Sequence, residues 1–209
     1  MKTIYLLQGL GQTTQDWNEV INHLPPDYNV RLIDSFQIGF VNESYSLEQA
    51  AHVLEKEIEK DEEGHKIVCG LSLGAVIAAQ HALMYPSKEV KYILSSFHPS
   101  PPKAIMALQT LVFTIFWRLI RSELGVDKDK QQVLSVLKSV KERDFSQDLL
   151  HLQQVRLLLV GEKDAIHVKA AKFIGQRFPN SEIKIIQNAG HEINEDQPIA
   201  LANEIINLD

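Results

Sequence analysis

The feature of this chain that most restricts its fold is an alternation of short apolar runs with amphipathic segments. Six runs have the length and composition of buried strands, and they lie at residues 4–7, 30–33, 66–69, 90–94, 155–160 and 182–186. Segments with helical periodicity separate most of them, and strands that alternate with helices form parallel sheets covered by helices. We therefore expect an α/β fold whose mostly parallel sheet has about six strands flanked by helices.

Residues 101–152 do not fit this alternation. They follow a proline-rich stretch at residues 98–102, which neither continues a strand nor lies inside a helix. Two helix-like runs then occupy residues 103–124 and 128–142. We interpret this insertion as a helical lid over the carboxyl-terminal edge of the sheet.

The chain is then expected to be one domain over residues 1–209, with its core at residues 1–100 and 153–209. The first lid run is apolar on most sides, which is more than packing against the core requires. This excess indicates an apolar pocket wall and hence an acyl or aromatic substrate. The aromatic side chains expected to contact that substrate are Phe113, Phe116 and Trp117.

A glycine–serine pattern stands where the third predicted strand meets the next helix. Gly70-Leu71-Ser72-Leu73-Gly74 matches the G-x-S-x-G nucleophile elbow, in which a strand turns sharply into a helix. The turn holds the serine in a strained conformation, needs small residues two positions to either side, and exposes the hydroxyl above the sheet. An apolar strand precedes the pattern and an alanine-rich helix follows it, so Ser72 is the predicted nucleophile.

A serine hydroxyl needs a base to take its proton and a carboxylate to hold that base in place. In a fold with this elbow the three residues follow one another as serine, acid and histidine. His191 lies in the loop after the sixth predicted strand and Asp164 in the loop after the fifth. Because parallel strands end at one sheet edge, both side chains are expected at the edge that carries Ser72.

Other side chains in these loops remain alternatives. Glu162 or Asp34 could supply the carboxylate in place of Asp164. His167 shares the loop of Asp164, but the order of the three residues calls for an acid in that loop.

Backbone N–H groups are expected to bind the oxyanion that forms when the serine attacks a carbonyl. The residue after the nucleophile, Leu73, supplies one N–H group, and Leu10, between two glycines in the loop after the first strand, supplies the other. Glycine lets the backbone of this loop approach a substrate closely. Gln8 and Gly9 are therefore expected to line the substrate site.

These motifs together make the chain similar to the α/β-hydrolase superfamily, in the compact branch with a helical cap. The resemblance covers nearly the whole length and rests on Gly9, Trp17, Asp34, the elbow, Gly161 to Asp164, Gly190-His191, Glu195 and Pro198. It implies a triad of Ser72, His191 and Asp164, with the tetrahedral intermediate held by the Leu10 and Leu73 N–H groups.

The chain departs from this family in two places. Gln8 stands where the family usually has a histidine, so the side chains of the oxyanion loop are expected to differ while its backbone donors remain. The family often begins with two further strands, whereas this sequence starts at what would be the third. A trimmed version of the fold is therefore expected.

The resemblance implies a serine hydrolase, and we expect a carboxylic ester or thioester hydrolase that acts on a small, largely apolar acyl substrate. Two alternatives stay open because this fold supports several chemistries. The same triad could serve a carbon–carbon hydrolase or a lyase. The chain could also be a non-catalytic member of the fold that binds a ligand or takes part in signalling.

Composition limits the partners and the compartment. The formal net charge of −6 disfavours nucleic acid or an anionic membrane as the main partner. A single cysteine, Cys69, excludes an intrachain disulfide, and the first residues lack the apolar length of a signal peptide. The sequence also shows no metal-ligand spacing, phosphate loop or dinucleotide fingerprint. We expect a cytoplasmic protein without cofactor, metal or stable membrane association.

Overall fold

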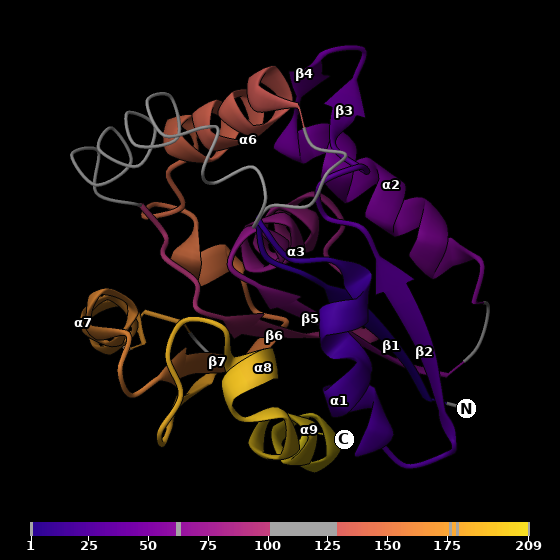
Figure 1. The fold of residues 1–209 in the computed structure, drawn as a ribbon, viewed down its shortest axis with the longest axis vertical. Coiled ribbons are helices and arrows are strands. Elements are labelled where there is room, and N and C mark those ends of the chain that lie inside the picture. Colours follow the sequence, from indigo (N-terminus) through magenta and orange to yellow (C-terminus); the bar gives the residue numbers. More distant parts are fainter. Residues whose placement is uncertain (1, 62–63, 101–128, 176, 179, 209) are drawn as a thin grey trace.

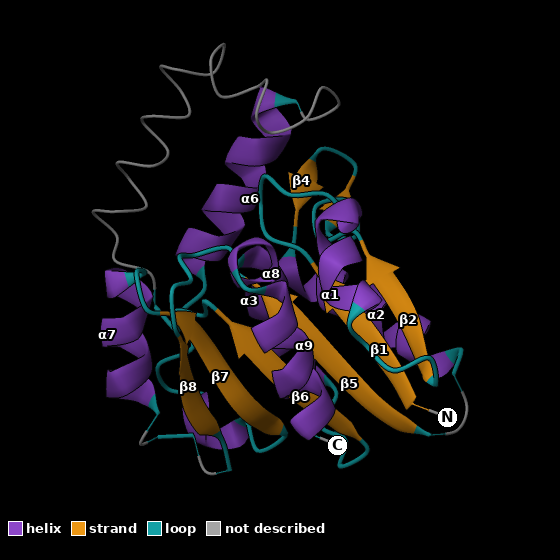
Figure 2. Cartoon of the chain, turned by 60° about the horizontal axis from the view of Figure 1, so that its bottom comes forward, coloured by secondary structure: helices purple, strands orange, loops and turns teal. Residues whose placement is uncertain are grey.

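One parallel sheet forms the centre of the computed structural model, which describes residues 2–61, 64–100, 129–175, 177–178 and 180–208 (Figure 2). Its strands are β1 (Lys2–Leu7), β2 (Tyr28–Ile33), β5 (His65–Leu71), β6 (Val90–Ser95), β7 (Val155–Gly161) and β8 (Glu182–Ile186). Their order across the sheet is β2-β1-β5-β6-β7-β8, and every neighbouring pair is parallel. The predicted α/β class is confirmed, and all six predicted strands lie at their expected places.

Helices cover both faces of this sheet (Figure 1). They are α1 (Asn18–Asn22), α2 (Leu47–Glu59), α3 (Leu73–Met84), α6 (Lys130–Glu142), α7 (Ala165–Ile174), α8 (Ile193–Asp196) and α9 (Pro198–Asn207), with short 3₁₀ helices η1 (Thr14–Trp17) and η2 (Leu149–His151). Helices α2 and α3 pack together on one face, whereas α1 and α9 pack on the other. Helix α7 lies beside β7 and β8.

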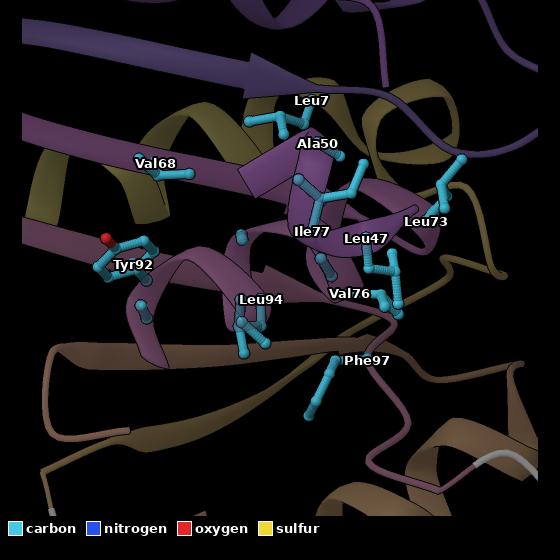
Figure 3. Close-up of a cluster of buried hydrophobic side chains, with 14 of the residues drawn as sticks. Leu7, Leu47, Ala50, Val68, Leu73, Val76, Ile77, Tyr92, Leu94 and Phe97 are labelled. Atoms are coloured by element: carbon cyan, nitrogen blue, oxygen red, sulfur yellow. The ribbon is translucent and has the colours of Figure 1, made fainter. Parts of the chain in front are cut away.

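Two apolar clusters hold these layers together. Figure 3 shows part of the larger one, to which Leu7 and Val68 of the sheet, Ile77 of α3 and Leu47 of α2 all belong. Trp17 belongs to the second cluster, on the side of α1 and α9. The inner strands β1, β5, β6 and β7 are mostly buried on both faces and consist largely of apolar runs, which is typical of parallel sheets, whereas the edge strands β2 and β8 keep exposed residues.

Local hydrogen bonds explain where the helices begin. Ser46 Oγ accepts a hydrogen bond from Gln49 N at 3.2 Å and so caps the first turn of α2. Helix α7 begins at Ala165, and the carboxylate of Asp164 caps it by accepting a hydrogen bond from His167 N. The acidic residue predicted for the triad thus also caps a helix.

The short antiparallel pair β3 (Phe40–Val41) and β4 (Ser44–Tyr45) was not predicted. Strands of two residues are too short for an alternating pattern to be visible in the sequence. Within the predicted lid, the second helix is present as α6, and Ser135 on it binds Tyr45 N at 2.8 Å. The first predicted lid helix, residues 103–124, lies outside the described residues, and the division into core and lid stays a prediction.

Within the described part of the chain, no helix combines the length and the apolar character that crossing a bilayer requires.

A buried histidine links three elements of the core. His81 of α3 is fully buried, with Nδ1 2.7 Å from the hydroxyl of Tyr92 and Nε2 2.9 Å from a carboxylate oxygen of Glu55. A neutral imidazole satisfies both contacts, since its Nε2–H donates to Glu55 while Nδ1 accepts from Tyr92. Burial lowers the pKa of His81 to about 4.

This histidine is expected to make the protein less stable in mild acid. Between pH 6.5 and about pH 4 the unfolded chain binds a proton at His81 that the folded chain does not. The free energy of unfolding is therefore unaffected by His81 above pH 6.5. It decreases as the pH falls below this value, by about 3 kcal/mol at most. Burial also raises the pKa of Glu55, and its protonation offsets part of the loss.

Urea unfolding at pH 7.5 and pH 4.5 measures this effect. His81→Gln, which has no titrating group, is expected to show a smaller difference between the two free energies of unfolding. An equal difference in the variant and the unmodified protein would contradict the assignment.

Candidate active site

Ser72 occupies the turn between the end of β5 and the start of α3. Its backbone has φ 52° and ψ −107°, and residues other than glycine rarely adopt a conformation with positive φ. A hydrogen bond from Ser72 N to Ser95 O at 2.9 Å ties this turn to the end of β6. The strained turn is the one that the G-x-S-x-G pattern predicts.

The glycines on either side allow three backbones to approach one another. A Cβ atom on Gly70 would overlap the backbone of Gly74, and one on Gly74 would overlap the carbonyl oxygen of Leu7. Helix α3 can therefore start directly over β1 and β5 only because both positions lack a side chain.

The structure brings the predicted triad together. His191, in the loop between β8 and α8, places Nε2 3.0 Å from Ser72 Oγ. Its other nitrogen, Nδ1, lies 2.7 Å from Oδ2 of Asp164, in the loop between β7 and α7. The side chain of His191 is 41% exposed, whereas that of Asp164 is only 9% exposed, so the contacts run from a partly exposed histidine to a nearly buried carboxylate.

Asp164 carries a charge in this arrangement. Burial alone would raise the pKa of its carboxyl, but hydrogen bonds from His167 and His191 outweigh burial and hold the pKa well below its usual range. An ionised carboxylate only accepts hydrogen bonds, so His191 must carry a proton on Nδ1. Its Nε2 then presents a lone pair to the hydroxyl of Ser72, which is the arrangement that a general base requires.

Two neighbours fix the backbone around His191. Ser96, which has φ 51°, donates a hydrogen bond from Oγ to the carbonyl oxygen of His191 at 2.8 Å. Gly190 N donates to a carboxylate oxygen of Asp196 at 2.6 Å. Sequence reasoning did not identify this role of Ser96, because a single serine after a strand carries no signal of a contact made 95 residues away.

The alternative carboxylates bind elsewhere. Glu162 accepts a hydrogen bond from Asn188 N at 3.0 Å. Asp34 accepts from Gln8 Nε2 at 2.9 Å and from Phe36 N at 3.0 Å. Each of these contacts stabilises a turn at the sheet edge, and the geometry therefore favours Asp164 as the partner of the base.

The expected oxyanion donors lie on the two predicted elements. Leu73 is the first residue of α3, and Leu10 follows β1. Within the described residues, neither N–H group donates a hydrogen bond to another part of the chain. In the same loop, Gly9 N donates to Oε1 of Gln12 at 3.2 Å, which holds the backbone before Leu10. The oxyanion role of both N–H groups stays a prediction.

The predicted substrate contacts are only partly covered by the structure. Phe113, Phe116 and Trp117 lie outside the described residues. The side chain of Gln8 is almost fully buried, and its amide binds both Asp34 and the backbone N–H of Ser35. These contacts give Gln8 a role in supporting the loop of Gly9, whereas substrate contact by either residue remains a prediction.

A pocket of about 570 Å³ lies along α7, and Ala165, the residue after Asp164, is part of its lining. Its walls include apolar side chains of α7, such as Ile166 and Phe173, together with His98 from the loop after β6. The His98 ring lies 6.0 Å from that of His167, which connects the pocket to the surroundings of Asp164.

Asp164, His167 and His191 also form a group of potential metal ligands, with ligand atoms that all lie within 4.8 Å of one another. The imidazole nitrogens of both histidines lie 2.7–2.9 Å from carboxylate oxygens of Asp164. These distances are typical of hydrogen bonds, whereas two ligand atoms of a tetrahedral zinc site would lie about 3.3 Å apart. Sequence reasoning had not placed His167 in the site.

Comparison with known proteins gives matches in sequence and structure, although no protein-family model matches the chain. A pimeloyl-[acyl-carrier protein] methyl ester esterase from Nitrosospira multiformis is 24% identical over 228 residues, which cover 90% of this chain and 87% of that protein. A hydrolase from Oleispira antarctica has a TM-score of 0.82 at 17% identity, covering 100% of this chain and 92% of that chain. An α/β-hydrolase enzyme from a Medee basin deep-sea metagenome library has a TM-score of 0.77 at 17% identity, covering 99% and 88%.

The solved structures resemble this chain over almost its full length, although few residues are identical. At this level of identity the similarity is one of fold, and it agrees with the parallel six-stranded sheet and its covering helices. The chain has the α/β-hydrolase fold.

Proposed function

We propose that this protein is a serine hydrolase that cleaves carboxylic esters or thioesters of small, largely apolar acyl groups. The observation that carries the proposal is the unbroken series of contacts from Ser72 Oγ through His191 to Asp164, at 3.0 and 2.7 Å. A serine held at a strained turn, with a base and an ionised acid in line, has the geometry of an activated nucleophile.

Each residue has one task in the reaction. Ser72 Oγ attacks the carbonyl carbon while His191 Nε2 takes its proton. Asp164 remains ionised, keeps the proton of His191 on Nδ1 and stabilises the imidazolium that forms. The N–H groups of Leu10 and Leu73 stabilise the oxyanion, and His191 then protonates the leaving alcohol or thiol. Water, deprotonated by the same imidazole, releases the acid from the acyl-enzyme.

Two observations favour an ester with an apolar acyl group. The relative from Nitrosospira multiformis is named for cleaving a methyl ester, and it matches most of this chain. The pocket along α7 has apolar walls at Ile166 and Phe173, and its lining begins at Ala165, the residue after Asp164. A pocket of this kind binds a substrate chiefly by burying its apolar surface.

The test is labelling with a fluorophosphonate probe, followed by assays with p-nitrophenyl esters of increasing acyl length. We expect the unmodified protein to be labelled and Ser72→Ala to remain unlabelled. Ester turnover is expected to peak at one acyl length, which would reflect the depth of the pocket.

Other outcomes separate the alternatives. The protein could be labelled and yet hydrolyse no ester or thioester. If it then cleaves a carbon–carbon bond or catalyses an elimination, the result would favour a carbon–carbon hydrolase or a lyase that uses the same triad. Absence of both labelling and turnover would contradict the hydrolase mechanism and favour a ligand-binding protein.

A further inference from the structure

Two imidazole rings share the carboxylate of Asp164. His191 Nδ1 lies 2.7 Å from Oδ2. His167 Nδ1 lies 2.9 Å from Oδ1 and 2.8 Å from Oδ2, so its N–H group points between the two oxygens. The backbone N–H of His167 adds a further contact to Oδ1 at 3.3 Å. Three donors from two residues therefore surround one acidic side chain.

The position of His167 in the chain produces this geometry. Asp164 caps α7, and His167 is the third residue of that helix, where the backbone N–H faces the capping side chain. Capping requires only the backbone N–H group of His167. The imidazole contact is additional, and it is directed at the carboxylate that also binds His191.

A carboxylate can rotate about the bond to its Cβ, and rotation would move Oδ2 out of line with His191. A donor placed between both oxygens opposes this rotation, since turning the carboxylate lengthens one of the two contacts of His167. Because an ionised Asp164 is an acceptor only, His167 must carry its proton on Nδ1 to make this contact.

We propose that His167 is a positioning residue of the triad, which holds the carboxylate of Asp164 in the orientation that His191 needs. This inference rests on the proposed hydrolase function. His167 acts through Asp164 and makes no direct contact with Ser72 that the structure records.

A third ring borders His167. His98 packs edge-on against it, with the ring centroids 6.0 Å apart, while the ring of His191 lies 4.8 Å away on a different element. Burial lowers the pKa of His98, with a further decrease from His167 and an opposing increase from Asp164. His98 therefore restricts rotation of the His167 ring, and because His98 is neutral it places no positive charge beside that ring.

Two substitutions separate positioning from packing. His167→Leu fills similar space without a donor, whereas His167→Asn keeps an N–H group near the place of Nδ1. We expect His167→Leu to lower kcat about tenfold with KM changed less than twofold, because a misdirected base affects the reaction rather than binding. His167→Asn is expected to recover most of this loss. His23→Leu, which removes an exposed histidine that follows α1, is the matched control.

Proton NMR gives a readout that does not depend on turnover. The unmodified protein is expected to show two strongly downfield imidazole N–H resonances, from His191 and His167 hydrogen-bonded to Asp164. In His167→Leu one resonance disappears, and the other shifts because its acceptor has lost a partner. An unchanged second resonance would overturn the proposal even if no ester is ever found to be a substrate.

The kinetic outcomes also distinguish the two proposals. If His167→Leu turns over esters as fast as the unmodified protein, His167 has no positioning role although the hydrolase function stands. If His167→Leu and His167→Asn lower kcat equally, the N–H donor does not account for the effect and the proposal is wrong. If the unmodified protein neither reacts with a fluorophosphonate nor cleaves esters, the hydrolase function fails, and the NMR result alone decides whether His167 orients Asp164.

Discussion

Replacing Ser72 with glycine is expected to remove catalytic turnover and yet to give a more stable protein than replacing it with alanine. Both variants lack Oγ, so both lose the nucleophile and the contact with His191. We expect kcat to fall by roughly 10⁶-fold in each case. The difference between them lies in the backbone, because φ 52° and ψ −107° suit glycine and strain alanine.

The size of this difference follows from two opposing effects. A residue held in such a conformation costs about 1–3 kcal/mol, which glycine relieves. Glycine also has more freedom in the unfolded chain, which lowers stability by about 0.4–1 kcal/mol. We therefore expect Ser72→Gly to exceed Ser72→Ala by about 1 kcal/mol in the free energy of unfolding.

Urea unfolding followed by circular dichroism measures this comparison, and p-nitrophenyl ester hydrolysis checks that both variants are inactive. Greater stability of the alanine variant would show that the elbow is not strained in solution. Substantial turnover by either variant would show that Ser72 is not the nucleophile.

Gly161→Ala is expected to damage both stability and turnover. Gly161 ends β7, and a Cβ atom there would overlap the carbonyl oxygen of Gly190 and lie 2.6 Å from that of Ala189. These atoms belong to the backbone that carries His191, so relieving the overlap displaces the base from Ser72. We expect a loss of about 3 kcal/mol in stability and a decrease of roughly 100-fold in kcat.

Gly9→Ala is the matched control for stability. Its added Cβ atom would make only ordinary contacts, of which the shortest is 3.5 Å, to Oε1 of Gln12. We expect its free energy of unfolding to change by less than about 1 kcal/mol. If Gly161→Ala is as stable and as active as the unmodified protein, the loops after β7 and β8 are less tightly packed than the structure indicates.

Sequence alone was sufficient to predict the sheet and the approach of Ser72, Asp164 and His191 to one another, because both depend on local patterns in a fixed order. Apolar runs located the six strands, and parallel strands place the loops that follow them at one edge. Ser72, Asp164 and His191 each stand in such a loop, so their meeting followed from the topology without knowledge of any distance.

The supporting contacts could not be obtained in that way. Ser96 binds the backbone of His191 across two chain segments whose approach depends on packing details that periodicity does not describe. His167 had a usable signal, since a side chain three residues after a helix-capping aspartate faces the same turn. Asp164 was not recognised from the sequence as a helix cap, and the signal was therefore missed.

The order of the strands also determines which part of the molecule opens most easily. Ser72 leaves β5, which has neighbours on both sides, whereas His191 follows β8, a five-residue strand at the edge of the sheet with a partner on one side. Edge strands with few buried side chains separate from a sheet at a lower free energy than central ones, so their amide hydrogens exchange with solvent sooner. His191 is thus attached to a less stable cooperative unit than Ser72. Mild denaturation is expected to disconnect the two while the central strands remain folded, so that activity is lost before the protein unfolds.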